Sequence, residues 1–148
     1  MPDWYCHSLV SKPEKQMTLS LEKKLVLIVD DTPINIEVIC GVLKDSFRTK
    51  VATNGEKALA IASASEKPDL ILLDVMMPGM DGYEVCRRLK ANPSTRDIPV
   101  IFLTAKTDAV DKEKGFEVGA VDYIHKPFSA PIVVARVNTQ LALQVGGK

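Results

Sequence analysis

The sequence predicts an α/β fold in which parallel strands alternate with helices that cover both faces of the sheet. Three continuous apolar runs of strand length support this prediction, and each leads into a polar residue: Leu25–Val29, Leu70–Leu73 and Pro99–Leu103. Strands that are apolar on both sides are typical of a buried parallel sheet. Segments in which apolar residues recur at helical spacing separate the runs, so strand and helix alternate along the chain.

Two weaker strands and five helices complete the predicted order of elements. The strands are Arg48–Ala52 and Asp122–His125. The helices are one that begins after Thr32 with Pro33 in its first turn, one capped by Asn54, Tyr83–Leu89 ending near Asn92, Asp108–Val118 stopping at Gly119, and Ala130–Leu143. Side-chain oxygens at the caps, proline in a first turn and glycine after a last turn each fit a helix end.

The first predicted helix is apolar over most of its length. Ile34, Val38, Ile39, Val42 and Leu43 share a face at helical spacing. We therefore expect these five residues to form the side of the helix that packs against the sheet.

Size, charge and cysteine content narrow the classes of function. The chain has 148 residues, which suits one domain, and its 19 basic and 19 acidic residues give a formal net charge of zero. We expect no direct nucleic-acid binding and no membrane anchor, because no basic patch stands out and no apolar run reaches the roughly 18 residues of a membrane span. Cys6, Cys40 and Cys86 lack metal-ligand spacing, which favours buried thiols in a reducing, cytoplasmic setting.

The regular pattern does not extend over the whole chain. Residues 1–23 are mixed in character, and we expect an N-terminal extension or linker there. Residues 24–144 are expected to form the domain, and residues 145–148 a C-terminal tail.

Polar side chains stand at the carboxyl ends of the predicted strands, where ligand sites form in open parallel sheets. The first strand ends in Asp30 and Asp31, the third in Asp74 and the fourth in Thr104, and the fifth leads into Lys126. Neighbouring carboxylates repel one another, so a cation is expected among them. Oxygen ligands suit a hard cation, and partial coordination with retained waters suits Mg²⁺.

Such a set of residues could accept a phosphoryl group. A carboxylate beside Mg²⁺ can attack phosphorus and form an aspartyl phosphate. The metal and Lys126 would offset charge on the transferring group, and Thr104 could donate a hydrogen bond to one of its oxygens. Nothing in the set activates a water strongly, so the acyl phosphate would persist long enough to act as a signal.

Four stretches of the sequence resemble the receiver domains of response regulators in two-component signalling. They are LVLIVDD, DLILLDVMMPGMDG, IPVIFLTA and GAVDYIHKPF, and the resemblance covers about residues 24–144. Each motif alone is modest, but the four in this order and spacing are highly specific. The resemblance implies a flavodoxin-like doubly wound (βα)5 fold with a five-stranded parallel sheet in the order 2-1-3-4-5. The first and fifth helices would cover one face and the other three helices the opposite face.

The resemblance also implies a phosphoacceptor and a metal site. Asp74 would be the phosphoacceptor. Asp31 would bind Mg²⁺ directly and Asp30 largely through water. The backbone carbonyl of Met76 would be a further ligand.

The resemblance also implies residues that change conformation on phosphorylation. Thr104 would be the switch hydroxyl and Tyr123 the switch aromatic, which turns inward when Thr104 moves toward the phosphoryl group. Lys126 would contact the phosphate, and its bond to Pro127 would be cis.

A sensor histidine kinase or phosphotransfer protein would therefore be the donor. The phosphorylated state would alter the surface formed by the predicted 108–118 helix, the fifth strand and the fifth helix. A second copy of the chain, forming a homodimer, or an effector would dock on that surface. The domain would not be an enzyme beyond a self-limiting autophosphatase activity.

Other functions on the same architecture fit the residues less well. A phosphatase with a nucleophilic aspartate needs a second acid two residues later, where this chain has Met76. A nucleotide or flavin binder needs a glycine-rich or hydroxyl-rich loop after the first strand, and DDTPIN is neither. A degenerate receiver used as a scaffold is disfavoured because the acidic residues, Thr104 and Lys126 are all present. A receiver segment of a larger hybrid histidine kinase, or of a cyclic-di-nucleotide phosphodiesterase or cyclase regulator, remains an alternative.

Overall fold

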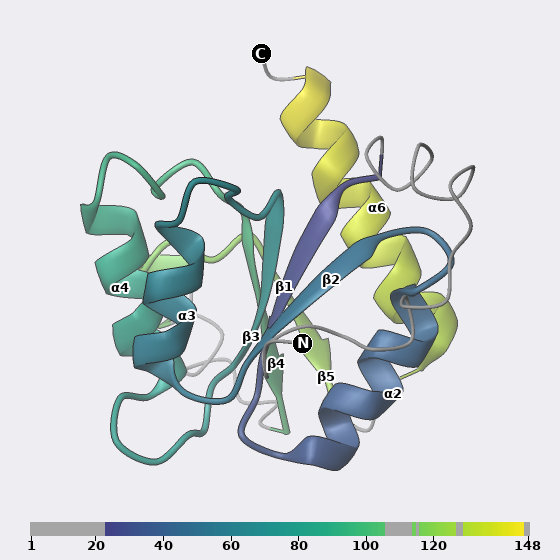
Figure 1. Cartoon of the computed structure of the whole chain (residues 1–148), viewed down its shortest axis with the longest axis horizontal. Coiled ribbons are helices and arrows are strands. Elements are labelled where there is room, and N and C mark those ends of the chain that lie inside the picture. The colour runs from purple at the N-terminus through teal and green to yellow at the C-terminus, as the bar shows by residue number, and fades with distance from the viewer. Residues whose placement is uncertain (1–22, 106–113, 115, 127–128, 147–148) are drawn as a thin grey trace.

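The computed structural model describes residues 23–105, 114, 116–126 and 129–146, and shows a five-stranded sheet between two layers of helices (Figure 1). All strand pairs are parallel, in the order β2-β1-β3-β4-β5, which confirms the predicted fold. The elements in chain order are β1 (Leu25–Val29), α2 (Pro33–Leu43), β2 (Arg48–Ala52), α3 (Gly55–Ala62), β3 (Leu70–Asp74), α4 (Gly82–Ala91), β4 (Val100–Thr104), β5 (Asp122–His125) and α6 (Ala130–Gly146).

The strand register brings the predicted site residues to one edge of the sheet. Val29 of β1 lies opposite Leu73 of β3, so the residues that follow them, Asp30 and Asp74, are level with each other. Asp74 in turn lies opposite Leu103 of β4, one residue before Thr104. The carboxyl ends of the three central strands therefore present their polar residues together.

Alternate residues of each strand pack into two separate apolar layers. Val26 and Ile28 of β1 pack with α2 and α6, whereas Leu27 and Val29 pack with α3 and α4. We call these two sides the α2/α6 face and the α3/α4 face. Val118 also packs on the α3/α4 face, at the end of the predicted 108–118 helix. The predicted placement of the helices is thus confirmed for the described residues; the start of that helix at Asp108 lies outside them.

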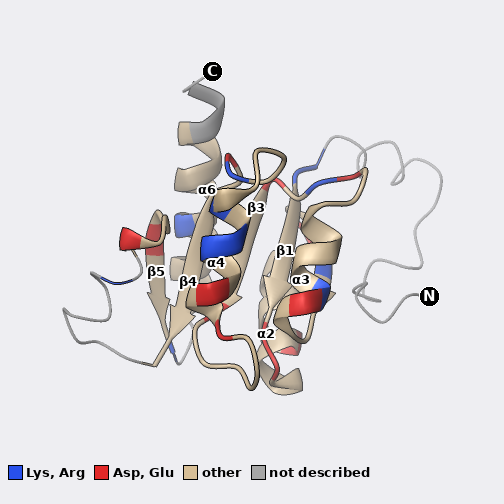
Figure 2. Cartoon of the chain, turned by 90° about the vertical axis from the view of Figure 1, so that its left-hand side faces the viewer, with Lys and Arg blue, Asp and Glu red and all other residues tan. Residues whose placement is uncertain are grey.

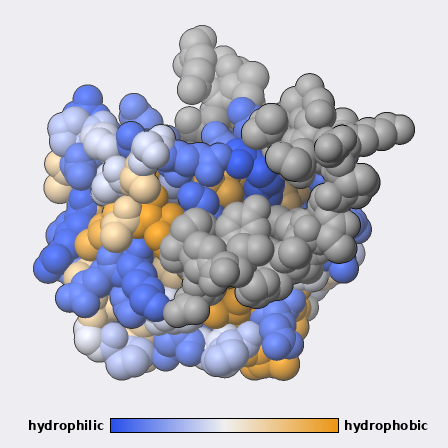
Figure 3. Space-filling model, in the orientation of Figure 1, coloured by the Kyte–Doolittle hydropathy of each residue, from blue (hydrophilic) through white to orange (hydrophobic). Residues whose placement is uncertain are grey.

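The predicted buried side of α2 is partly wrong. Ile39 and Leu43 are buried, but Ile34 is 63% exposed and Val38 is 44% exposed. Apolar residues occur almost all the way around this helix, so spacing alone could not select the buried side. The exposed apolar start of α2 forms an orange patch at the lower edge of the view in Figure 3.

Helix ends agree closely with the sequence signals. The Asn54 side chain accepts a hydrogen bond from the Lys57 N–H at 2.8 Å and caps α3, as predicted. Thr32 occupies the cap position of α2, although its side chain makes no capping hydrogen bond. Gly119 has a φ of 108°, which favours glycine, and follows the last turn at Val118. Helix α6 continues to Gly146, beyond the predicted end at Leu143.

Two further expectations concern the cysteines and membrane spans. Cys40 and Cys86 are both buried free thiols, as predicted; Cys6 lies outside the described residues. In the part of the chain that the structure describes, none of the helices is both long enough and apolar enough to cross a membrane.

Candidate functional site

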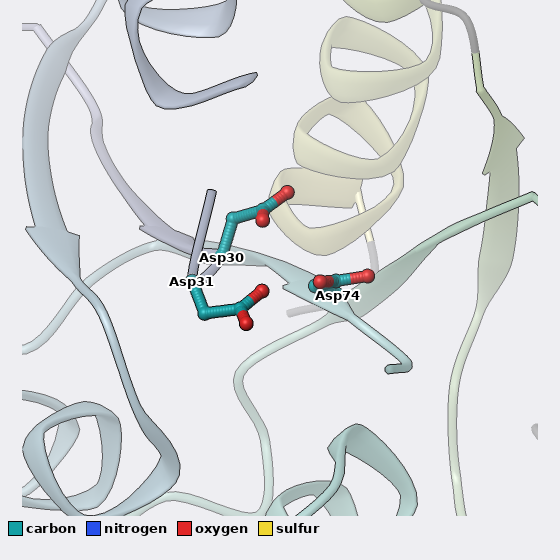
Figure 4. Close-up of side chains that lie close together, drawn as sticks. All are labelled: Asp30, Asp31 and Asp74. Carbon is teal, nitrogen blue, oxygen red and sulfur yellow. The ribbon is translucent and has the colours of Figure 1, made fainter. Parts of the chain in front are cut away.

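Three carboxylates meet at the carboxyl ends of β1 and β3. Asp30 and Asp31 follow β1, and Asp74 is the last residue of β3. One carboxylate oxygen from each lies within 4.8 Å of the other two (Figure 4). Figure 2 shows the acidic segment at the point where β1 runs into α2. The structure therefore brings together the acidic residues that the sequence placed at one site.

Asp30 is fully buried and is held in place by the start of α2. Its Oδ1 atom accepts a hydrogen bond from the Thr32 N–H at 2.9 Å, and its Oδ2 atom accepts one from Asn35 Nδ2 at 3.3 Å. The sequence analysis did not single out Asn35. Its position in the first turn of α2, five residues after Asp30, was the available signal.

Lys126 places a positive charge between the two buried carboxylates. Its Nζ atom lies 3.1 Å from Asp74 Oδ1 and 3.4 Å from Asp30 Oδ2. Asp74 is 2% exposed, and this burial is the main reason why the pKa of its carboxyl is raised to about 6. The hydrogen bond from Lys126 lowers that pKa, whereas the charge of Asp30 raises it further. One ammonium thus compensates only part of the charge of three carboxylates.

The loop after Asp74 returns closely against the acceptor strand. The Gly82 N–H donates to the Val75 carbonyl at 2.9 Å, and a Cβ atom on Gly82 would stand 2.3 Å from the Asp74 carbonyl oxygen. Glycine is therefore required where α4 begins. The Asp81 side chain caps this helix by accepting from the Glu84 N–H at 2.9 Å, a signal that the sequence analysis missed.

Met76 lies beside Asp74 in this loop. Its N–H donates to Asp74 Oδ1 at 3.4 Å, and its side chain is 62% exposed. The predicted role of its carbonyl as a metal ligand stays a prediction.

The two predicted switch residues lie on neighbouring strands. Thr104 is 3% exposed at the end of β4, and its carbonyl accepts a hydrogen bond from the Lys126 N–H at 2.9 Å. Tyr123 of β5 is 5% exposed, with its ring facing inward against Phe102 and Phe116 at centroid distances of 5.9 and 5.2 Å. The predicted cis bond at Pro127 lies outside the described residues.

The residues present fit a hard divalent cation. The set offers carboxylate oxygens alone, the ligand type that such cations prefer. Two of the three carboxylates are buried, and their negative charge exceeds that of the adjacent ammonium. A cation would favour the charged form of Asp74, whose pKa is raised first by burial and further by the charge of Asp30.

Comparison with known proteins identifies the family. The family model described as the response regulator receiver domain matches residues 26–138. The chain belongs to the response regulator receiver domain family. The same architecture occurs in a response regulator from Chloroflexus aurantiacus, with 39% sequence identity, a TM-score of 0.77, and coverage of 81% of this chain and 98% of that one.

Two other similar proteins are a receiver domain described with magnesium and a longer protein that contains a similar region. The receiver domain of a sensor histidine kinase from Pseudomonas aeruginosa, 31% identical with a TM-score of 0.71, is described with a magnesium ion coordinated in its active-site cleft. The match covers 84% of this chain and 98% of that domain. A protein from Vibrio cholerae named as a probable cyclic di-GMP phosphodiesterase is 49% identical over 121 residues. The match covers 82% of this chain but spans only 27% of that protein.

Proposed function

We propose that this receiver domain accepts a phosphoryl group on Asp74 from a phosphorylated histidine of a sensor kinase or phosphotransfer protein. The observation that supports this most strongly is the set around Asp74: a buried carboxylate beside two further carboxylates and hydrogen-bonded to Lys126. In the transfer, an Asp74 carboxylate oxygen forms a bond to phosphorus while the bond between phosphorus and the histidine nitrogen of the donor breaks. The electron pair of that bond stays on the histidine nitrogen, and because the other ring nitrogen of the phosphohistidine is protonated, the donor leaves with a neutral imidazole.

Asp31, Asp74, the Met76 carbonyl and, through water, Asp30 would hold Mg²⁺. When bound, the ion supplies positive charge that offsets the negative charge of the phosphoryl oxygens. Lys126 holds Asp74 at 3.1 Å in the resting site, and its ammonium is placed to bind a phosphoryl oxygen once the carboxylate has reacted. Slow hydrolysis of the acyl phosphate would limit the signal, and the domain would otherwise act as an acceptor and not as an enzyme.

The donor would approach past an apolar rim. Ile34 and Val38 of α2 and Met76 of the acceptor loop are exposed at 63%, 44% and 62%. Ile34 follows Asp31 by three residues and Met76 follows Asp74 by two, so both are near the carboxylates in the sequence. They suit an apolar helix face of the protein that carries the phosphohistidine.

Phosphorylation would then change a second surface, the one formed by the predicted 108–118 helix, β5 and α6. It adds roughly 1.5 to 2 negative charges and strong acceptor oxygens. Thr104 would move its hydroxyl toward a phosphoryl oxygen, and the Tyr123 ring, which lies inward in this structure, would be held there because it fills the space behind Thr104. The side chains of Phe116, Val121 and Ile132 are 52%, 38% and 46% exposed on this side, and a second copy or an effector would dock there.

The length of the Vibrio cholerae relative favours a second candidate context. Because the chain spans only 27% of that protein, it could act as the receiver segment of a larger regulator. The regulator would carry a cyclic-di-nucleotide phosphodiesterase or cyclase, or a hybrid histidine kinase. The chemistry at Asp74 would be the same in each case.

Phosphorylation by a small acyl phosphate tests the proposal directly. We expect intact-mass spectrometry with acetyl phosphate and Mg²⁺ to show one added phosphoryl group in the wild type and none in Asp74→Asn. Asp31→Ala should require at least about tenfold more Mg²⁺, whereas Asp45→Ala, which removes an exposed carboxylate after α2, should match the wild type. Equal Mg²⁺ dependence in Asp31→Ala and the wild type would overturn the metal assignment, and full modification of Asp74→Asn would overturn the acceptor.

A further inference from the structure

The contact between Lys114 and Tyr83 joins two segments that the mechanism above leaves unconnected. Lys114 lies in the last turn of the predicted 108–118 helix, where its carbonyl accepts a hydrogen bond from the Val118 N–H at 3.2 Å. Its Nζ atom lies 4.6 Å from the centroid of the Tyr83 ring. An ammonium in this position is attracted by the negative face of the ring. The helix end is therefore attached to α4 as well as to the sheet.

Tyr83 is closely tied to the backbone of the acceptor. It follows Gly82, whose Cα lies so near β3 that an added Cβ would stand 2.3 Å from the Asp74 carbonyl oxygen. Gly82 is also hydrogen-bonded to the Val75 carbonyl at 2.9 Å. A shift of the backbone at Asp74 and Val75 would therefore move the first turn of α4, and Tyr83 with it.

The ring of Tyr83 has a second contact, with the sheet. It is 7% exposed and packs edge-on against Phe102 of β4, with ring centroids 5.2 Å apart. A closely packed ring that contacts both the sheet and Lys114 would pass on a shift of the α4 backbone, because packed interiors have little free space to absorb it.

We propose that Tyr83 is a positioning residue that couples the loop after Asp74 to the segment containing Lys114 and Phe116 through its contact with Lys114. This connection runs parallel to the one through Thr104 and Tyr123, and the inference rests on the proposed phosphorylation of Asp74. Phe116, two residues after Lys114, contacts Tyr123, so the helix end is attached to both aromatic residues.

The direction of the effect follows from the structure. The contact of Lys114 with Tyr83 is present together with a buried Tyr123, which is the orientation that the proposed function assigns to the phosphorylated domain, so the contact stabilises that orientation. A cation–π contact at an exposed position changes an equilibrium by about two- to fivefold. Loss of the contact removes this stabilisation and lowers the population of the inward Tyr123 state by that factor. More of the phosphoryl mimic is then needed to reach the phosphorylated arrangement, because the mimic acts by shifting the equilibrium toward the state it binds better.

The test is a titration with beryllofluoride, a mimic of the phosphoryl group, at saturating Mg²⁺. The amide resonances of Val121 and Ile124 would report the switch. We expect Lys114→Gln to need about two- to fivefold more beryllofluoride at the midpoint than the wild type. Lys114→Arg should restore the wild-type midpoint, because a guanidinium also stacks on an aromatic ring. Lys57→Gln removes an exposed charge from α3 and should leave the midpoint unchanged.

A double-mutant cycle makes the result specific to the pair. Tyr83→Leu keeps apolar volume but removes the ring face, and it should raise the midpoint as Lys114→Gln does. The double variant should then be no worse than Tyr83→Leu alone. A wild type that does not respond to beryllofluoride would contradict the proposed function. If the wild type responds but Lys114→Gln has an unchanged midpoint, or if the losses in the double variant are additive, the coupling through Tyr83 is wrong and the proposed function is unaffected.

Discussion

The two faces of the sheet are built from different kinds of contact. On the α2/α6 face, the buried layer is almost entirely aliphatic, as in Val133 and Val137 of α6 against Ile28 and Leu72 of the sheet. On the α3/α4 face, three ring pairs occur in succession, from Tyr83 through Phe102 and Tyr123 to Phe116. Aliphatic side chains interlock in many small contacts, whereas a row of rings passes a displacement from one ring to the next. The difference suggests that one face anchors the domain and the other responds to the site.

The space around the glycines also differs between the two faces. A Cβ on Gly82 would meet the Asp74 carbonyl oxygen, and one on Gly55 would meet Val85 at 2.7 Å. Both lie on the α3/α4 face. Gly41 of α2 has nothing within 4 Å of the corresponding position. Tight packing around glycine, against a side chain at Gly55 and against the backbone at Gly82, is thus a feature of the face that contains the loop after Asp74.

The largest expected effect comes from neighbouring residues of β4 that point to opposite faces. Phe102 and Leu103 are both fully buried. Phe102→Ala should cost about 3–5 kcal/mol of unfolding free energy and Leu103→Ala about 2–5 kcal/mol, measured by urea denaturation. Only the change at Phe102 should also weaken the response of Phe116 to beryllofluoride, because it removes the ring that lies between Tyr83 and Tyr123 but leaves the route through Thr104 and Tyr123.

A less disruptive substitution at Phe102 gives a control in case Phe102→Ala does not fold. Phe102→Leu removes the ring but keeps most of the volume, so it should fold and still weaken the response of Phe116. Equal responses of Phe116 in Phe102→Leu and Leu103→Ala would show that the rings are packing residues alone.

A smaller effect is expected from the two glycines. Gly82→Ala should destabilise the domain by about 1–3 kcal/mol, because its Cβ would be forced against the Asp74 carbonyl. Gly41→Ala should stabilise it by up to about 1 kcal/mol, because alanine is the better helix former and space is available. Thermal and urea denaturation of the two variants would measure both changes. A stabilised Gly82→Ala would contradict the close approach of α4 to the acceptor.

The sequence was sufficient for the sheet and the site, because both depend on short-range patterns. Apolar runs marked the central strands to within one residue, and the polar residues after them fell at one edge as parallel pairing requires. The buried side of α2 could not be predicted, since Ile34 and Ile39 are equally apolar and only packing decides between them. The contact of Lys114 with Tyr83 joins residues 31 positions apart in sequence, and neither residue type signals it.

The central claim is that phosphorylation of Asp74 moves the α3/α4 face through Thr104 and leaves the α2/α6 face in place. The most direct measurement compares amide and aromatic chemical shifts with and without beryllofluoride and Mg²⁺, in the wild type and in Thr104→Ala. We expect large changes at Tyr83, Tyr123 and Phe116 in the wild type, small changes at Val133 and Val137, and loss of the Tyr123 and Phe116 changes in Thr104→Ala. Changes of equal size on both faces, or identical responses in the two proteins, would contradict the account.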